Sequence, residues 1–419
     1  MNLFQPSTFL FTKSHTSWPT KTQELLIKAA ILDGNEAIDA WQEWTSIVAI
    51  NEIDDNSRIL LPLLYKNLRN HNINDPSIDI YKREYRTTWF KTNLLYKNAT
   101  LPLQSFHNAG VRTMLIKGAA LTTLYYKDLG LRPMDDVDVL VHPEDVKASF
   151  DLLEKLGWRP TEKVLKSFDN KYLSFSYSRG FENDSGFAFD LNWHLIKLCC
   201  EVDADDSFWK GAFPIKFLDM PVLVLNPTDQ LMHVCFHGIT HIPMSPKWIA
   251  DAIMIINYSG SEIDWDRLLA QVQERHIVLP LNDTLAYLHN RLNASIPERV
   301  LRKLSSIHIS GYEQMEYHAT TGLTKQMGSL PRLWFFYRRH SSPKNNTNSD
   351  SISFIQYLRY IWGLEQLWKV PFQFVFKVIK RGWKLVFSFM FFMPFFDFVS
   401  FVSFALFVIL CPSFLLRLS

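Results

Sequence analysis

The feature that most constrains this chain is a short acidic segment, residues 132–141, whose sequence is RPMDDVDVLV. In a β-strand successive side chains point to opposite faces, so Asp136 and Asp138 would share one face while the valines enter a core. Asp135 would lie on the valine face, which makes Asp136 the better partner for Asp138. Two convergent carboxylates are the usual protein ligands of a magnesium ion that also binds the phosphates of a substrate. For an isolated Asp-x-Asp pair, a solvated strand edge is the simpler interpretation. The neighbouring segments therefore decide between a solvated edge and a metal site.

The segment before the acidic strand has the pattern of a strand, a tight turn and a helix. Residues 111–116 are apolar enough for a short buried strand, Lys117 and Gly118 follow, and helical spacing continues to Tyr126. A glycine at such a turn lets the backbone approach a phosphate, and the start of a helix offers free N–H groups. Lys117 and Arg132 would add positive charge on either side of the acidic strand.

A third acid lies in residues 186–194, which alternate strictly as a strand does. One face would carry large aromatic and aliphatic side chains, and the other would carry Ala188, Asp190, Asn192 and His194. Asp190 would then be a lone acid in an apolar half-strand, where a buried carboxylate needs a metal or a cation as its partner. We expect residues 172–177 to pair with this segment as a hairpin and to bring Asp190 beside the first two acids. His194 fits either a hydrogen-bonded strand end or a cleft.

This order of motifs resembles the nucleotidyltransferases of the DNA polymerase β superfamily. More narrowly, the chain resembles the bacterial family of uncharacterised nucleotidyltransferases and, more distantly, the nucleotidyltransferase toxins of abortive-infection systems. The likeness covers residues 110–195 and continues more weakly to Asp251. It implies transfer of a nucleoside monophosphate from an NTP to a hydroxyl or phosphate acceptor, with two Mg²⁺ ions as cofactors and Mn²⁺ as an alternative.

The resemblance also implies roles for individual residues. The catalytic acids, which are also the metal ligands, would be Asp136, Asp138 and Asp190. The phosphate turn would be formed by Lys117 and Gly118. The other candidates for nucleotide binding are Arg132, for its charge beside the acidic strand, and His237, as a residue of the cleft. The turn departs from the Gly-Ser pattern of better-known members, because Ala119 follows Gly118. Lys117 would replace the missing serine contact electrostatically.

Composition limits the remaining possibilities. The chain has 419 residues, is 47% hydrophobic and carries a formal net charge of +2, so it can bury a full core and should form two or three domains. Its basic residues are dispersed until the C-terminal quarter, which gives no strong nucleic-acid signature. The four cysteines have neither zinc nor disulfide spacing, and the N-terminus lacks a secretory pattern, so we expect a cytoplasmic protein.

Periodicity predicts an α+β fold, with a small mixed nucleotidyltransferase sheet flanked by helices, helical N- and C-terminal regions and an apolar C-terminal tail. Within the sheet region, residues 144–156 should be a helix that ends at Gly157. The predicted regions are a helical N-terminal region (1–105), a nucleotidyltransferase domain (106–225), a helical domain (226–340), a linker (341–352) and a membrane-associating tail (353–419).

Helical spacing returns at Thr228, which is the expected N-cap. One stripe of this helix should pack on another helix, and it consists of Leu231, Val234, Cys235 and Gly238. His233 and His237 are one turn apart, which is a metal-ligand spacing but also fits ordinary packing. His237 could instead line the nucleotide cleft, and weaker candidates for that cleft are His241, Trp248 and Asp251.

The C-terminal end has a different composition. Residues 369–384 mix lysine and arginine with aromatic and aliphatic side chains, which suits an anionic membrane surface. Residues 398–416 contain no charge and are long enough to cross a bilayer, while residues 385–396 form a second apolar segment. A tail anchor, a re-entrant hairpin, a buried helix pair and a partner-binding tail all remain open. We expect attachment to the inner membrane with the catalytic part in the cytoplasm.

Two classes of function follow. The first is an active enzyme that uses an NTP and an acceptor, which could be a small molecule, a peptide or a tRNA end. The second is a catalytically inactive nucleotidyltransferase fold that serves as a binding or scaffold protein at the membrane. The presence of all three acids favours the enzyme.

Overall fold

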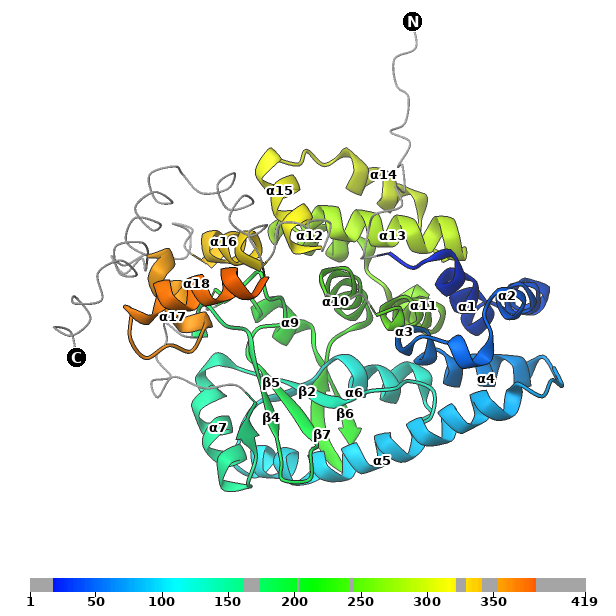
Figure 1. The fold of residues 1–419 in the computed structure, drawn as a ribbon, viewed down its shortest axis with the longest axis horizontal. Coiled ribbons are helices and arrows are strands. Elements are labelled where there is room, and N and C mark those ends of the chain that lie inside the picture. The colour runs from blue at the N-terminus through cyan, green and yellow to red at the C-terminus, as the bar shows by residue number, and fades with distance from the viewer. Residues whose placement is uncertain are drawn as a thin grey trace, which may run out of the picture.

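A computed structural model of the chain describes residues 18–161, 173–201, 203–241, 245–321, 329–340 and 353–381. These residues form an α+β fold in which helices cover both faces of one mixed seven-stranded sheet (Figure 1). The predicted fold class is therefore confirmed.

The sheet has the strand order β3-β4-β5-β2-β1-β7-β6. Its strands are β1 (Thr113–Leu115), β2 (Asp136–Val141), β3 (Arg159–Pro160), β4 (Ser178–Glu182), β5 (Ala188–Asn192), β6 (Phe213–Phe217) and β7 (Met220–Val224). β2 is parallel to β5 and β1 is parallel to β7, whereas the other neighbouring strands are antiparallel. The predicted acidic strand is thus β2, at the centre of the sheet.

Helices precede and interrupt the strands. The N-terminal ones are α1 (Lys21–Ile31), α2 (Gly34–Ile47), the 3-10 turn η1 (Ile50–Glu52), α3 (Asp55–Arg58), α4 (Leu61–Asn70) and the long α5 (Ile78–Asn108). Within the sheet region lie α6 (Lys117–Leu121), the π-helical turn η2 (Thr122–Tyr126), the 3-10 turn η3 (Pro143–Asp145), α7 (Val146–Lys155) and α9 (Asp206–Gly211). The predicted helix at residues 144–156 is η3 and α7, and Gly157 follows it with a positive φ of 83°.

Further helices follow the last strand. They are α10 (Pro227–Thr240), α11 (Lys247–Ser259), the 3-10 turn η4 (Gly260–Glu262), α12 (Trp265–Glu274), α13 (Val278–Leu292), α14 (Glu298–Ser306), α15 (Gly311–Thr320), α16 (Ser329–His340), α17 (Phe354–Ile361) and α18 (Lys369–Arg381). α10 is the central helix above the sheet in Figure 1. Its predicted packing stripe meets α11, because a Cβ on Gly238 would lie 2.1 Å from the ring of Trp248.

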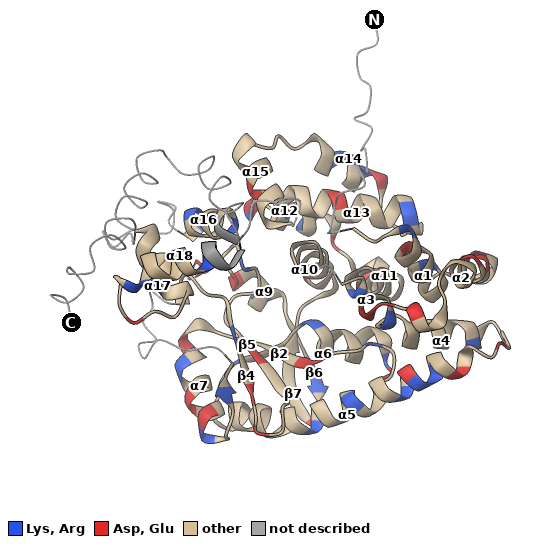
Figure 2. Cartoon of the chain, in the orientation of Figure 1, with Lys and Arg blue, Asp and Glu red and all other residues tan. Residues whose placement is uncertain are grey.

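Two hydrophobic cores lie on the two faces of the sheet. Val137, Val139 and Val141 are fully buried against α5 and α7 on one face. Leu140 belongs to the other core, which joins the N-terminal helices to α10, α11 and the helices that follow them. By strand alternation the acids of β2 share the Leu140 face, so they point toward the side of the sheet covered by α10 and α11. Figure 2 colours the acidic residues of the chain red.

The hairpin predicted for the third acid forms, but its first strand was placed too early. β4 begins at Ser178 and pairs with β5, whereas residues 173–177 are not part of a strand. The Tyr177 carbonyl accepts hydrogen bonds from the backbone N–H groups of Trp193 and His194, so the chain turns there. Phe175, which belongs to the predicted strand, instead packs with α17. Tyr172 lies outside the described residues.

The predicted N-cap of α10 was wrong by two positions. Asn226 is the N-cap, and its side-chain oxygen accepts a hydrogen bond from the N–H of Asp229 at 3.0 Å. Pro227 occupies the first helical position, which suits a residue without an N–H. The Thr228 hydroxyl instead accepts a hydrogen bond from the N–H of Asp264 at 2.8 Å and ties α10 to the start of α12.

Only part of the C-terminal region is described. The predicted linker and residues 385–396 and 398–416 fall outside the described residues. α18 begins at the predicted basic amphipathic segment, and it packs with α16 and α17 around the buried Tyr357, Leu358 and Val370. Within the ranges that the structure describes, no helix combines the length and the apolar character needed to cross a membrane.

Candidate active site

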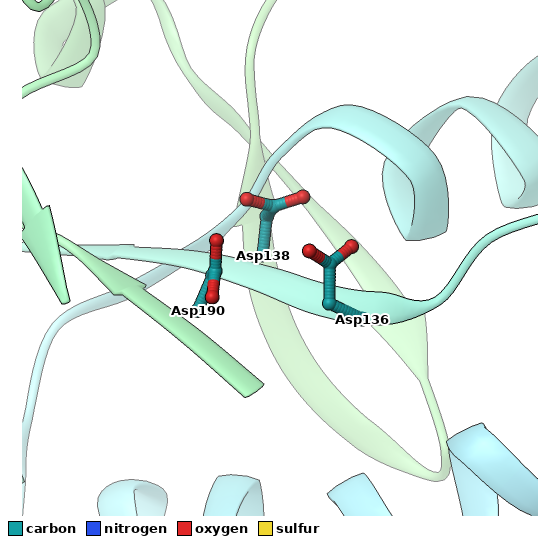
Figure 3. A group of neighbouring side chains, drawn as sticks. All are labelled: Asp136, Asp138 and Asp190. Carbon is teal, nitrogen blue, oxygen red and sulfur yellow. The ribbon is translucent and has the colours of Figure 1, made fainter. Parts of the chain in front are cut away.

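Strand pairing brings the three predicted acids together. Asp138 lies opposite Asp190 in the parallel register of β2 and β5, and Asp136 is two residues earlier on the same face. Each of the three offers a carboxylate oxygen, and these oxygens lie within 4.8 Å of one another (Figure 3). Asp138 is buried, whereas Asp136 and Asp190 are half-buried. Asp135 is exposed and lies outside the group, as strand alternation predicted.

The three carboxylates carry more negative charge than their surroundings neutralise. The charge of Asp138, together with burial, raises the pKa of Asp136 to about 7. Burial, together with Asp138, raises the pKa of Asp190 to about 6. Both shifts mean that an additional cation would stabilise the ionised site. The carboxylate oxygens that converge from β2 and β5 are hard donors, which are the ligands that Mg²⁺ and Mn²⁺ prefer.

Lys117 is the positive group closest to the acids. It follows β1 with a φ of 48°, which is uncommon for a residue with a side chain. Its Nζ donates a hydrogen bond to Oδ1 of Asp138 at 2.5 Å. Burial lowers the pKa of Lys117, but the charges of Asp138 and Asp190 raise it by more, so the net pKa lies above its usual value. Lys117 is therefore a charged amine on the rim of the triad.

Gly118 and Arg132, predicted to bind phosphate, pack against each other. A Cβ on Gly118 would lie 2.7 Å from Nη1 of Arg132, so the guanidinium occupies the space that a side chain would need. Arg132 is bound on its other side by Asp251 of α11, with Nε to Oδ1 at 2.7 Å and Nη2 to Oδ2 at 2.8 Å. This ion pair, which the sequence analysis did not predict, fixes the guanidinium beside the turn at Lys117.

A row of histidines follows α10, with His233 and His237 in the helix and His241 at its C-cap. The ring centroids of His233 and His237 are 5.9 Å apart, and those of His237 and His241 are 5.5 Å apart. Burial, reinforced by the charge of Lys117, lowers the pKa of His233 to about 3 and the pKa of His237 well below its usual value. His237 is thus a neutral imidazole within electrostatic reach of Lys117. Among the described residues, no third ligand completes a metal site with His233 and His237.

Two lysines near the site were missed. Lys247 begins α11 and interacts electrostatically with Asp136. Burial is the largest cause that lowers the pKa of Lys247, and the charge of Arg132 is the second. The family resemblance extends to Asp251, only four residues further on. That resemblance is a signal that could have identified Lys247. Lys197 donates a hydrogen bond from Nζ to the carbonyl of Thr240 at 2.9 Å. No sequence signal marked Lys197.

Two roles were predicted for His194, a hydrogen-bonded strand end and a cleft residue, and the structure shows the first. Its Nδ1 is 2.8 Å from Oδ2 of Asp205, and both side chains are buried. The other oxygen of Asp205 accepts a hydrogen bond from the N–H of Leu195 at 3.1 Å. The pair therefore fixes the chain as it leaves β5.

Comparisons with known proteins assign the chain to a family. Among solved structures, the chain is similar to an antigenic nucleotidyltransferase-like protein from Paracoccidioides brasiliensis, with 14% identity and a TM-score of 0.30 over 50% of this chain and 96% of that chain. No curated protein matches the chain. A family model described as "Uncharacterised nucleotidyltransferase" matches residues 56–293, which is more than half of the chain and includes the three acids. The chain therefore belongs to the family of uncharacterised nucleotidyltransferases.

Proposed function

We propose that this protein is a metal-dependent enzyme that transfers a nucleoside monophosphate from an NTP to a hydroxyl or phosphate acceptor. The observation that carries the proposal is the convergence of Asp136, Asp138 and Asp190 on one face of β2 and β5. Membership of a nucleotidyltransferase family supports the reaction class. Relatedness to the DNA polymerase β superfamily is part of the same proposal.

The three acids would hold divalent metal, which we propose to be two Mg²⁺ ions. Bound metal would supply Lewis-acid activation of the reacting oxygens. Lys117 and Arg132 would bind the triphosphate beside Gly118, and the neutral imidazole of His237 would line the same cleft. This arrangement keeps positive groups next to the leaving pyrophosphate, where negative charge develops.

The chemistry assigned to the chain is positioning, charge stabilisation and one proton transfer. The bond from the acceptor oxygen to the α-phosphorus forms while the bond from the α-phosphorus to the bridging oxygen of pyrophosphate breaks. When the acceptor is a hydroxyl, its proton passes to a carboxylate oxygen of Asp190.

The alternative, an inactive scaffold with the same fold, has less support. Asp136 and Asp190 both have raised pKa values, so holding them ionised beside Asp138 costs stability. A protein that serves only as a scaffold would have no use for three acids placed so close together, whereas a metal-binding site requires them.

The transfer reaction can be tested without knowing the acceptor. Full-length protein is incubated with each α-³²P-labelled NTP, Mg²⁺ and a cell extract, and labelled species are separated and identified. We expect label to appear on one class of acceptor with at least one NTP, and we expect EDTA to abolish it because the acids then lack metal. Equal labelling in the presence and absence of EDTA would contradict metal dependence. An absence of labelling with all four NTPs would favour the scaffold.

We also propose that the C-terminal region attaches the protein to the cytoplasmic face of the inner membrane. α18 and the turn before it support this proposal, because Trp368 is 41% exposed and Phe376 is 60% exposed beside basic residues. The Nζ of Lys369 lies 5.6 Å from the ring centroid of Trp368, and the Nζ of Lys377 lies 5.3 Å from the ring centroid of Trp362. Aromatic and basic side chains together suit an anionic lipid surface.

Membrane attachment has a direct test by fractionation. The full chain is compared with a chain that ends at Arg381, which keeps all the described residues. We expect the full chain to stay with membranes after a carbonate wash and the shortened chain to move to the soluble fraction, because the apolar segments have been removed. Recovery of both chains in the same fraction would count against an anchor beyond residue 381.

A further inference from the structure

Arg132 is held in place by a buried network that reaches across the fold. Its guanidinium meets the Asp251 carboxylate side-on through Nε and Nη2, and the Tyr126 hydroxyl donates a third hydrogen bond to Oδ1 of Asp251 at 2.7 Å. Arg132 is 9% exposed, Tyr126 is 6% exposed and Asp251 is 3% exposed. The network joins η2 and the segment before β2 to α11.

The side-on pair leaves the opposite edge of the guanidinium available. Nη1 lies 2.7 Å from the position that a Cβ on Gly118 would take, at the turn where Lys117 meets Asp138. A guanidinium bound through Nε and Nη2 still has both hydrogens of Nη1 and one hydrogen of Nη2 for another anion. The available edge of Arg132 therefore lies at the turn proposed to hold phosphate.

We propose that Asp251 is a positioning residue for nucleotide binding: it holds Arg132 so that the Nη1 edge meets a phosphate of the NTP at the turn formed by Lys117 and Gly118. Gly118 is glycine because a side chain there would displace Nη1. Fixing a long, flexible side chain before the ligand arrives removes an ordering cost from binding. This inference rests on the proposed function and names the residues that build its phosphate site.

A matched pair elsewhere in the chain separates positioning from stability. Asp229 of α10 meets Arg267 of α12 with the same side-on geometry, with Nε to Oδ1 at 3.0 Å and Nη2 to Oδ2 at 2.7 Å. Asp229 is fully buried, and it also accepts a hydrogen bond from Asn226 in the loop before α10. Asp229→Asn should therefore weaken a buried ion pair as Asp251→Asn does, without altering the turn at Gly118.

The test measures the binding of α,β-methylene analogues of ATP, GTP, CTP and UTP to full-length protein by calorimetry with Mg²⁺. We expect Asp251→Asn and Asp229→Asn to lower the melting temperature by similar amounts. Only Asp251→Asn should weaken analogue binding, by about 10-fold to 100-fold, which is the change expected for losing one charge-assisted hydrogen bond. Gly118→Ala should weaken it similarly, and the double variant Gly118→Ala/Asp251→Asn should add little further loss because both act through Arg132.

Each outcome decides the proposal. Wild-type affinity in a folded Asp251→Asn variant, or an equal loss in Asp229→Asn, would overturn the positioning role while leaving the proposed function intact. Failure of the wild-type protein to bind any of the four analogues would overturn the proposed function as well. If Asp251→Asn does not fold, Gly118→Ala decides: a loss of affinity supports the role of Arg132, and unchanged affinity refutes it.

Discussion

Replacing Asp138 with asparagine is expected to lower the rate of nucleotidyl transfer by about 10³-fold or more while leaving the fold intact. Asp138 is 4% exposed, lies opposite Asp190 and accepts the hydrogen bond from Lys117. Asparagine keeps the size of the side chain and an oxygen that can accept from Lys117, but it removes the negative charge that would hold a divalent metal. Activity should therefore fall far more than stability.

Asp135→Asn is the matched control for this variant. Asp135 lies one residue from Asp136, but its side chain is exposed and lies outside the triad. Initial rates of label transfer, circular dichroism and thermal denaturation are measured for both variants and for wild-type protein. Asp135→Asn should keep its rate within about 3-fold, in line with the small effects of surface substitutions. Full activity of Asp138→Asn with Mg²⁺ and each of the four NTPs would refute the assignment.

Asp136→Asn is expected to stabilise the metal-free protein at pH 8 even though it should inactivate the enzyme. The pKa of Asp136 is raised from 3.8 to about 7, because Asp138 is close and the site is partly buried. Its protonated form therefore contributes stability that is fully present below pH 3.8 and is lost as pH rises through 7. Asparagine stays neutral at every pH, so at pH 8 the variant should be more stable than wild type by on the order of 1 kcal/mol.

Chemical denaturation in EDTA at pH 8 and at pH 5 measures this effect. The advantage of Asp136→Asn should shrink at pH 5, because wild-type Asp136 is then largely protonated in the folded state. Added Mg²⁺ should stabilise wild type but not the variant, since a ligand that binds only the folded state raises its stability. Asp135→Asn should match wild type throughout. Lower stability of Asp136→Asn at pH 8 would show that the acids do not repel one another in the folded protein.

The centre of the site could be predicted from sequence because its signal is local. Alternation in residues 136–141 assigned Asp136 and Asp138 to one face, and the three valines of β2 are buried on the other face. Alternation in β5 likewise placed Asp190 opposite its aromatic residues. A one-residue change of register would move every side chain to the other face. A strand with valines on one face and acids on the other therefore shows in its sequence which side chains share a face.

The surroundings of the site could not be predicted because they depend on long-range contacts. Arg132 and Asp251 are 119 positions apart, and no local pattern links them. Lys197 comes within electrostatic reach of Lys117 and His237 because the chain after β5 meets the end of α10 at Thr240. The error at residues 172–177 has a related cause, since Phe175 in this segment is buried by α17 and not by strand pairing. Periodicity indicates that a side chain is buried, but it does not identify what buries it.

Crystals of the full-length protein grown with Mn²⁺ and a non-hydrolysable NTP analogue would test the central claim most directly, through the anomalous signal of manganese. The claim predicts anomalous peaks at coordination distance, about 2.2 Å, from carboxylate oxygens of Asp136, Asp138 and Asp190. It also predicts that the phosphates lie beside Lys117. Manganese and nucleotide bound together elsewhere, with the three acids uncoordinated, would contradict it.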